Sequence, residues 1–121
     1  MATPPVDRNA LVELLDGDPD LVVTIINSFL DDCPSYMGAI REAVEDEDAE
    51  TLKREAHGLK GATGSLRAQP ACEAATVLEE MGRSADFTEA ESALETLDHE
   101  IERLKEELNA LKAECQEASG S

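Results

Sequence analysis

The residues best suited to chemistry lie in one short stretch, Ala56-His57-Gly58-Leu59-Lys60-Gly61-Ala62-Thr63-Gly64-Ser65-Leu66. In an α-helix each residue advances by about 100°, so His57, Gly61 and Gly64 would form one stripe. Lys60 would lie beside this stripe. Glycine inside a helix costs about 0.5–1 kcal/mol relative to alanine, so glycines at 58, 61 and 64 require an explanation. We expect that they leave room for a large group to reach an exposed imidazole.

The opposite side of the same helix is apolar. Its members recur at three- and four-residue intervals and are Leu52, Ala56, Leu59, Thr63 and Leu66. Such a stripe enters a protein core, so the pattern predicts that His57 points into solvent.

Local charge also sets this helix apart. Four cations and one anion lie within residues 51–67, which gives the segment a formal charge of +3, whereas the whole chain of 121 residues carries −18. The four cations are Lys53, Arg54, Lys60 and Arg67. A small basic island in an acidic molecule suits a transient dianionic group better than a large polyanion.

Composition excludes several other classes of function. The strong negative charge argues against nucleic acid or an anionic membrane surface as the main partner, because phosphate groups would be repelled. No apolar run approaches the length of a membrane span or a signal peptide, so we expect a soluble, cytoplasmic protein. Aromatic residues are scarce, with two Phe, one Tyr and no Trp, which is typical of an all-helical chain.

The cysteines and histidines do not indicate a metal site. Cys33, Cys72 and Cys115 are far apart and form no C-x-x-C motif, so we expect reduced packing residues. The two histidines have no ligand-like spacing, and His99 lies among acidic residues where we expect it to be solvated. An independent hydrolase or metalloenzyme is therefore disfavoured.

Capping residues and apolar periodicity predict five helices. A short helix begins at Asp7 and ends near residues 16–17. A second begins at Asp18-Pro19 and ends at the acidic run 45–48, with Pro34 predicting either a bend or a break. Asp46 or Asp48 would cap the His57 helix, which should end at Leu66 or Arg67. A fourth helix would span residues 69–82, and a long fifth would follow residue 86.

The fifth helix carries a heptad seam. Its apolar residues are separated by three and four positions and are Leu94, Leu97, Ile101, Leu104, Leu108 and Leu111. We favour packing of this seam inside the chain's own bundle, which makes the protein monomeric. The alternative is that its distal half, from about Leu104, pairs with a second copy.

Amphipathic helices joined by short polar turns predict an all-α fold, an up-down antiparallel four-helix bundle with a short additional N-terminal helix. We expect one domain over residues 1–117 and a disordered tail at 118–121. With no sign of a deep cleft, an exposed nucleophile on a helix fits a reaction whose remaining machinery arrives on another protein. Imidazole is largely neutral near pH 7 and can attack phosphorus without a serine-type base.

The residues 56–61 resemble the A-H-x-L-K-G signature of histidine-containing phosphotransfer (HPt) domains, the intermediate carriers of two-component phosphorelays. Phe29-Leu30-Asp31-Asp32-Cys33-Pro34 is similar to the family's F-L-x-x-x-P segment. Asp48 and Leu52 match its spacing ahead of the histidine, so the resemblance covers residues 11–81. Two positions depart from the family pattern: Arg67 stands where a glycine is frequent, and Ala62 where a serine is frequent.

The resemblance implies that His57 accepts a phosphoryl group on Nε2 from a receiver-domain aspartate and passes it to another receiver. Lys60 would stabilise the phosphoryl oxygens, and Gly61 would allow close approach. The chain would be a carrier rather than an enzyme, with a hybrid histidine kinase and response-regulator receiver domains as partners. It would need no cofactor, because magnesium belongs to the receiver.

The partner would dock on the His57 face. The residues expected to contact it are Lys53, Arg54, Gly61, Gly64, Arg67, Met37 and Ile40. The alternative is a relay-inactive binding or adaptor module, which could dimerise through the seam of residues 94–111.

Overall fold

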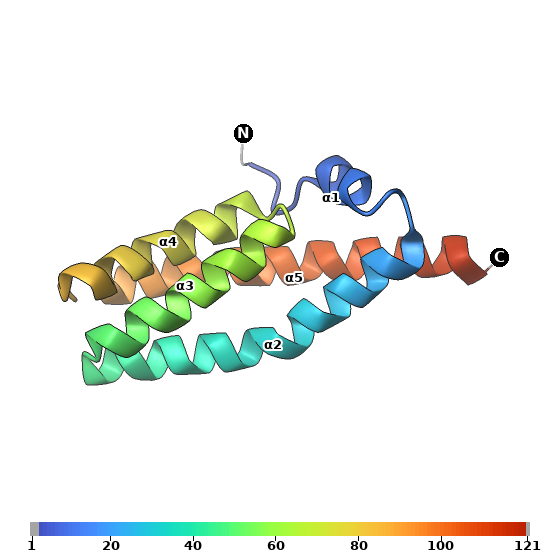
Figure 1. Cartoon of the computed structure of the whole chain (residues 1–121). Coiled ribbons are helices and arrows are strands. Elements are labelled where there is room, and N and C mark those ends of the chain that lie inside the picture. The colour runs from blue at the N-terminus through green and yellow to red at the C-terminus, as the bar shows by residue number, and fades with distance from the viewer. Residues whose placement is uncertain (1–2, 121) are drawn as a thin grey trace.

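The computed structural model describes residues 3–120 and is built from helices (Figure 1). They are α1 (Arg8–Leu14), α2 (Pro19–Asp46), α3 (Ala49–Ser65), α4 (Gln69–Ser84) and α5 (Ala90–Gly120). No strand occurs among these residues, so the predicted all-α class is confirmed. No helix in this part of the chain is long and apolar enough to cross a bilayer.

Helices α2 to α5 form an up-down bundle in which α2 and α4 each pack against both α3 and α5 (Figure 1). The short helix α1 lies outside this bundle, as predicted. The backbone N–H of Asp7 donates to the carbonyl of Arg67 at 2.9 Å, which ties the start of α1 to the turn between α3 and α4. Arg8 forms ion pairs with Glu107 and, at 2.7 Å, with Glu114 of α5.

Three helices begin at an aspartate. The carboxylates of Asp7, Asp18 and Asp48 accept hydrogen bonds from backbone N–H groups two or three residues further on, at 3.0–3.3 Å. These bonds satisfy donors that a helix leaves unpaired at its start. Of the two candidates for capping the His57 helix, Asp48 is therefore the one used.

Pro34 bends α2 without breaking it. The helix is continuous from Pro19 to Asp46, with Pro34 inside it, and it bends near its middle (Figure 1). Proline removes one backbone donor, and its ring pushes away the carbonyl four residues earlier, which accounts for a bend at this position.

The turn after α3 contains Arg67, the residue that stands where the HPt pattern frequently has glycine. The N–H of Arg67 donates to the carbonyl of Gly64, and that of Ala68 to Thr63, each at 3.0 Å. This pairing is a Schellman motif, whose central residue has a left-handed backbone and is usually glycine. Arg67 adopts that conformation, with φ of 60°, at a cost of roughly 1 kcal/mol. Consequently α3 ends at Ser65, slightly earlier than predicted.

The heptad seam of α5 lies in the chain's own core. Leu97, Ile101, Leu104 and Leu108 are at most 2% exposed, and Leu111 is 6% exposed. The distal half of the seam is thus covered and offers no surface for a second copy. Helix α5 continues to Gly120, so the predicted disordered tail overlaps it at residues 118–120, while residue 121 lies outside the described residues.

Candidate functional site

Helix α3 presents the two faces predicted for it. Leu52, Ala56, Leu59 and Thr63 are fully buried, and the Leu66 that follows α3 is 1% exposed. The His57 side chain is 69% exposed. Because the apolar stripe is inserted in the core, the rotation of α3 about its axis is fixed. His57 therefore stands on an open flank of the bundle, as the sequence predicted.

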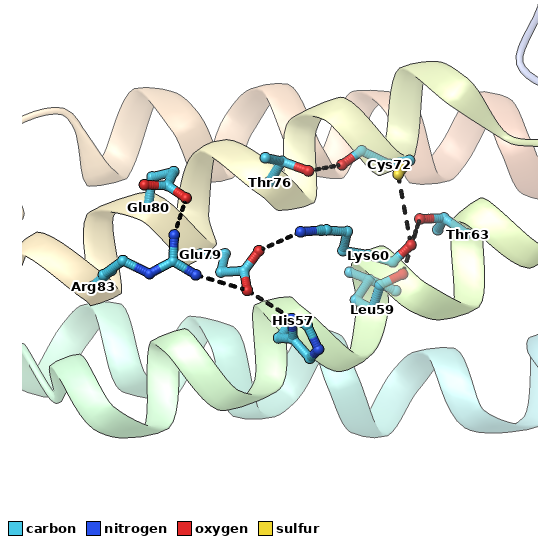
Figure 2. Close-up of polar contacts among 9 residues, drawn as sticks. All are labelled: His57, Leu59, Lys60, Thr63, Cys72, Thr76, Glu79, Glu80 and Arg83. Atoms are coloured by element: carbon cyan, nitrogen blue, oxygen red, sulfur yellow. Dashed lines mark hydrogen bonds and ion pairs between the residues drawn. The ribbon is translucent and has the colours of Figure 1, made fainter.

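A buried carboxylate joins the two predicted chemical residues (Figure 2). The Nδ1 atom of His57 lies 2.6 Å from Oε2 of Glu79, and Nζ of Lys60 lies 2.9 Å from its Oε1. Glu79 comes from α4 and is only 2% exposed. One side chain on a neighbouring helix thus holds both His57 and Lys60 in place.

The charge of Glu79 determines which ring nitrogen of His57 carries the proton. Hydrogen bonding to the Lys60 ammonium, followed by that to His57, holds the pKa of the Glu79 carboxyl below its ordinary value of 4.5, although burial acts in the opposite direction. An ionised carboxylate can only accept hydrogen bonds, so Nδ1 of His57 must be the donor. In the neutral ring the lone pair is then on Nε2, the nitrogen that points away from Glu79 (Figure 2).

Arg83 is a further cation beside the same carboxylate. Its Nη2 lies 3.5 Å from Oε2 of Glu79, and its Nη1 pairs with Glu80. Sequence analysis missed both Glu79 and Arg83. A signal was present, because Glu79 falls four residues after Ala75 and three before Gly82, on the stripe of α4 that is buried. A glutamate on such a stripe requires a cationic or donor partner.

The backbone carbonyl of Lys60 accepts hydrogen bonds from side chains of both α3 and α4. The Cys72 thiol donates to the carbonyl of Lys60 at 3.6 Å, and the Thr63 hydroxyl donates to the carbonyls of Leu59 and Lys60 at 2.9 and 3.1 Å (Figure 2). All three cysteines are free thiols. Cys72 is therefore a packing residue, as predicted, and it packs next to the site.

The three glycines of α3 do not share one role. A Cβ atom at Gly58 would lie 2.7 Å from the ring of Tyr36, so this glycine lets α2 pack against α3. A Cβ at Gly64 would lie 3.7 Å from the Cys72 sulfur, an ordinary contact. At Gly61 no described atom outside the helix's own backbone comes within 4 Å. The predicted clearing beside the imidazole is consequently confined to Gly61.

Two predicted docking residues are wrong. Met37 is 7% exposed and Ile40 is fully buried, because both lie on the stripe of α2 that faces the core. The apolar pattern that suggested them is the pattern of an internal face, and a partner cannot contact them directly.

The other predicted docking residues are spread along α3. Arg54 is exposed one turn before His57, and Lys53 is half-buried, with Nζ 3.7 Å from Glu50. Arg67 is exposed but lies in the turn after α3, ten residues after His57. The basic island is thus an elongated strip, with Lys60 placed beside the imidazole by their shared carboxylate.

The arrangement suits nucleophilic chemistry by one exposed nitrogen. The described residues include no group of three or more His, Cys, Asp or Glu side chains placed to hold a metal ion. They do provide an imidazole whose Nδ1 is bound by Glu79 and whose Nε2 is a nucleophile. Two cations, Lys60 and Arg83, contact the same carboxylate. Such a site can accept an anionic electrophile that another molecule presents.

Replacing Glu79 with glutamine is expected to lower the free energy of unfolding at pH 7 by about 1–3 kcal/mol, because two charge-assisted hydrogen bonds to a buried acceptor are weakened. Since the folded pKa of Glu79 is lowered, its stabilising effect is present above pH 4.5 and is lost as pH falls through the folded value. Urea unfolding of both proteins between pH 7 and 3 would measure this. A stability gap that stays constant below pH 4.5 would contradict it.

Comparisons with known proteins identify the family and a similar fold. The family model described as Hpt domain matches residues 24–117. The fold is similar to the crystal structure of histidine-containing phosphotransfer protein B (HptB) from Pseudomonas aeruginosa PAO1, with a TM-score of 0.83 and 22% identity over 96% of this chain and 98% of that one. No curated protein matches the chain. Because the family model spans most of its length, the chain belongs to the Hpt domain family.

Proposed function

We propose that this protein is the phosphoryl carrier of a two-component phosphorelay. His57 accepts a phosphoryl group from the aspartate of one receiver domain, such as that of a hybrid histidine kinase, and passes it to the aspartate of another. The observation that carries the proposal is the exposed imidazole whose Nδ1 is bound by a buried carboxylate. This contact leaves Nε2 as the nucleophile and aims it at solvent, where a partner must bring the phosphate.

On this chain, the bonds that form and break in the transfer step involve only Nε2 of His57. The Nε2 lone pair attacks phosphorus, and the bond between phosphorus and the aspartate oxygen breaks, which releases a carboxylate on the receiver. The ring then has phosphorus on Nε2 and a proton on Nδ1, so it carries a positive charge. Glu79 stabilises this charge through its 2.6 Å contact with Nδ1. Magnesium is supplied by the receiver.

Purified protein mixed with a phosphorylated receiver and magnesium tests the proposal. We expect label to appear on this chain in an acid-labile, base-stable form, which is the behaviour of a phosphoramidate rather than a phosphoester. Addition of a second, unphosphorylated receiver should then remove the label. If no receiver domain of the same organism passes label to this chain, the proposal is overturned.

Lys60 is expected to change partner during the reaction. In the free protein it pairs with Glu79 at 2.9 Å, and a phosphoryl group on His57 offers a stronger negative charge one turn of helix away. Lys60→Ala should slow transfer or shorten the phosphorylated lifetime by about tenfold, because one charge-assisted contact to the phosphoryl group is lost. Time courses of labelling and of label loss measure both quantities.

Lys105→Ala is the matched control, because this lysine lies on α5, is about as exposed as Lys60 and pairs with Glu102. It should leave the rate and the lifetime unchanged. Equal effects of the two substitutions would show that Lys60 acts only through net charge.

The docking surface is proposed to lie beside Gly61, between α2 and α3, in place of the buried Met37 and Ile40. A shallow cavity of about 150 Å³ there is lined by Ile25, Ser28, Phe29, Asp32, Ala62, Ser65 and Leu66. His57, Gly61 and Ser65 are exposed at four-residue intervals, so they share one stripe of α3. A protein that covers the imidazole along this stripe would also cover the cavity.

Gly61→Trp tests this surface. Because the space beside Gly61 is open, the indole should not disturb the bundle, but it would obstruct a docking protein. We expect transfer from the receiver to fall by about tenfold or more, since a bulky side chain disrupts the core of an interface.

Gly38→Trp provides the comparison. Gly38 is an exposed helical glycine on α2 with no described atom outside the helix's own backbone within 4 Å of an added Cβ. Gly38 follows Tyr36 by two residues, so it lies about 200° around the α2 axis from the side of α2 that packs on α3. Transfer by this variant should match wild type. An equal loss in the two variants would refute the proposed surface.

A further inference from the structure

Helix α2 ends and α5 begins at the same end of the bundle (Figure 1). A groove of about 810 Å³ is formed there by the last turn of α2 and residues 87–94. Four of its lining residues are apolar, and we call them the apolar floor: Val44, Phe87, Ala90 and Leu94. Val44, Phe87 and Leu94 are each only partly buried against the core, so part of each side chain is accessible from the groove.

The rim of this groove is strongly acidic. Glu45, Glu47 and Glu91 are exposed along it. The groove also has one lining cation, Arg41, whose charge is already offset by an ion pair with Asp98. These acids therefore face the groove without a compensating charge from its lining.

Helix polarity adds to this negative potential. The carboxyl end of a helix carries a partial negative charge, which basic residues normally offset. The last turn of α2, all of whose residues are described, contains no basic residue and instead contains Glu45 and Asp46. Glu47 follows with a left-handed backbone. Like charges at this end oppose folding, and a cationic partner would relieve them.

The groove is separate from the phosphotransfer site. Its lining comes from α2, from the connection after α4 and from α5, whereas His57 is on α3 and contacts α4. A protein segment seated in the groove would leave Nε2 of His57 accessible. Binding there is compatible with simultaneous docking of a receiver beside Gly61, because that surface uses residues 25–32 of α2 and the groove uses residues 41–47.

We propose that this groove binds a cationic amphipathic segment of a partner protein. An aromatic or branched aliphatic side chain of that segment fills the apolar floor, and flanking Lys or Arg residues pair with Glu45, Glu47 and Glu91. The apolar floor supplies the attraction and the acidic rim selects the charge. This proposal does not depend on the phosphorelay role, because it uses none of the residues of the His57 site.

Fluorescence anisotropy with a labelled synthetic peptide tests the proposal. The peptide has adjacent Phe and Leu residues flanked by lysines, and a comparison peptide keeps the lysines but replaces Phe and Leu with Ser. At near-physiological salt, where long-range attraction is screened, wild type should bind the first peptide about tenfold more tightly than the second. Equal affinities would show attraction by net charge alone and would overturn the proposal.

Matched substitutions on α5 locate the binding site. Glu91→Arg reverses one charge at the rim, and Glu106→Arg makes the same change at another exposed position about 22 Å further along the helix. Affinity for the Phe-Leu peptide should fall about tenfold in Glu91→Arg and less than about twofold in Glu106→Arg. Circular dichroism confirms that each variant is folded before it is compared. Equal losses in both would overturn the proposal.

Amide chemical shifts give an independent readout on the wild-type chain. Addition of the Phe-Leu peptide should shift the amides of residues 44–47 and 87–94. Shifts clustered on α3 around His57 would place the peptide on the phosphotransfer face and would also overturn the proposal.

Discussion

His57→Gln is expected to lower phosphoryl transfer from a receiver domain by more than about 10³-fold, because an amide nitrogen has no available lone pair to attack phosphorus. Glutamine is also polar and can still donate a hydrogen bond toward Glu79. The bundle should therefore remain folded, since His57 is exposed and contributes nothing to the core. Labelling from a phosphorylated receiver, with circular dichroism on the same samples, measures both effects.

The second histidine makes a close control. His99 lies exposed on α5 and belongs to the same residue type, so His99→Gln changes composition in the same way. Its labelling should equal that of wild type. Label retained by His57→Gln, or lost in His99→Gln, would show that the phosphoacceptor has been assigned to the wrong residue.

Gly82→Ala is expected to destabilise the protein by about 3 kcal/mol, which is large for the addition of one methyl group. An ideal Cβ at this position would lie 2.6 Å from the backbone N of Lys53 and 2.9 Å from the carbonyl oxygen of Ala49. Backbone atoms cannot rotate away as a flexible side chain does, so α3 and α4 would have to separate. Urea unfolding measures the change in stability.

The same substitution should also impair transfer in molecules that remain folded. Glu79 lies one turn before Gly82 on α4, so separation of α3 from α4 would lengthen its contact with His57. Gly38→Ala is the control, because its Cβ would meet no described atom outside its own helix backbone and alanine favours a helix by about 0.5–1 kcal/mol. A loss of stability in both variants would argue against close helix packing as the cause.

Much of this protein could be predicted from local sequence. The caps at Asp7 and Asp18, the burial of Leu52, Ala56 and Leu59, and the exposure of His57 all follow from residue types at helical spacing. Each depends on interactions within a helix or on its apolar stripe, and these have a fixed period along the chain.

The same reasoning failed where one amphipathic stripe was assigned to a partner. Met37 and Ile40 were expected at the docking surface but lie in the core. Periodicity identifies which residues share a face, and it does not distinguish a face covered by the chain itself from one covered by another protein. The seam of α5 had the same ambiguity, and there the prediction that it packs inside the chain's own bundle is confirmed.

Contacts between helices were decided by the tertiary structure. Glu79 reaches His57 across 22 residues, Tyr36 occupies the space at Gly58, and Gly82 abuts the backbone of Lys53. Each contact depends on the rotation and axial register with which two helices meet, which are set by packing over the whole core. The sequence alone therefore predicted His57 as the candidate nucleophile and identified the helix that carries it. The folded bundle decided which nitrogen of that histidine is free to react, because the carboxylate that binds the other one comes from a neighbouring helix.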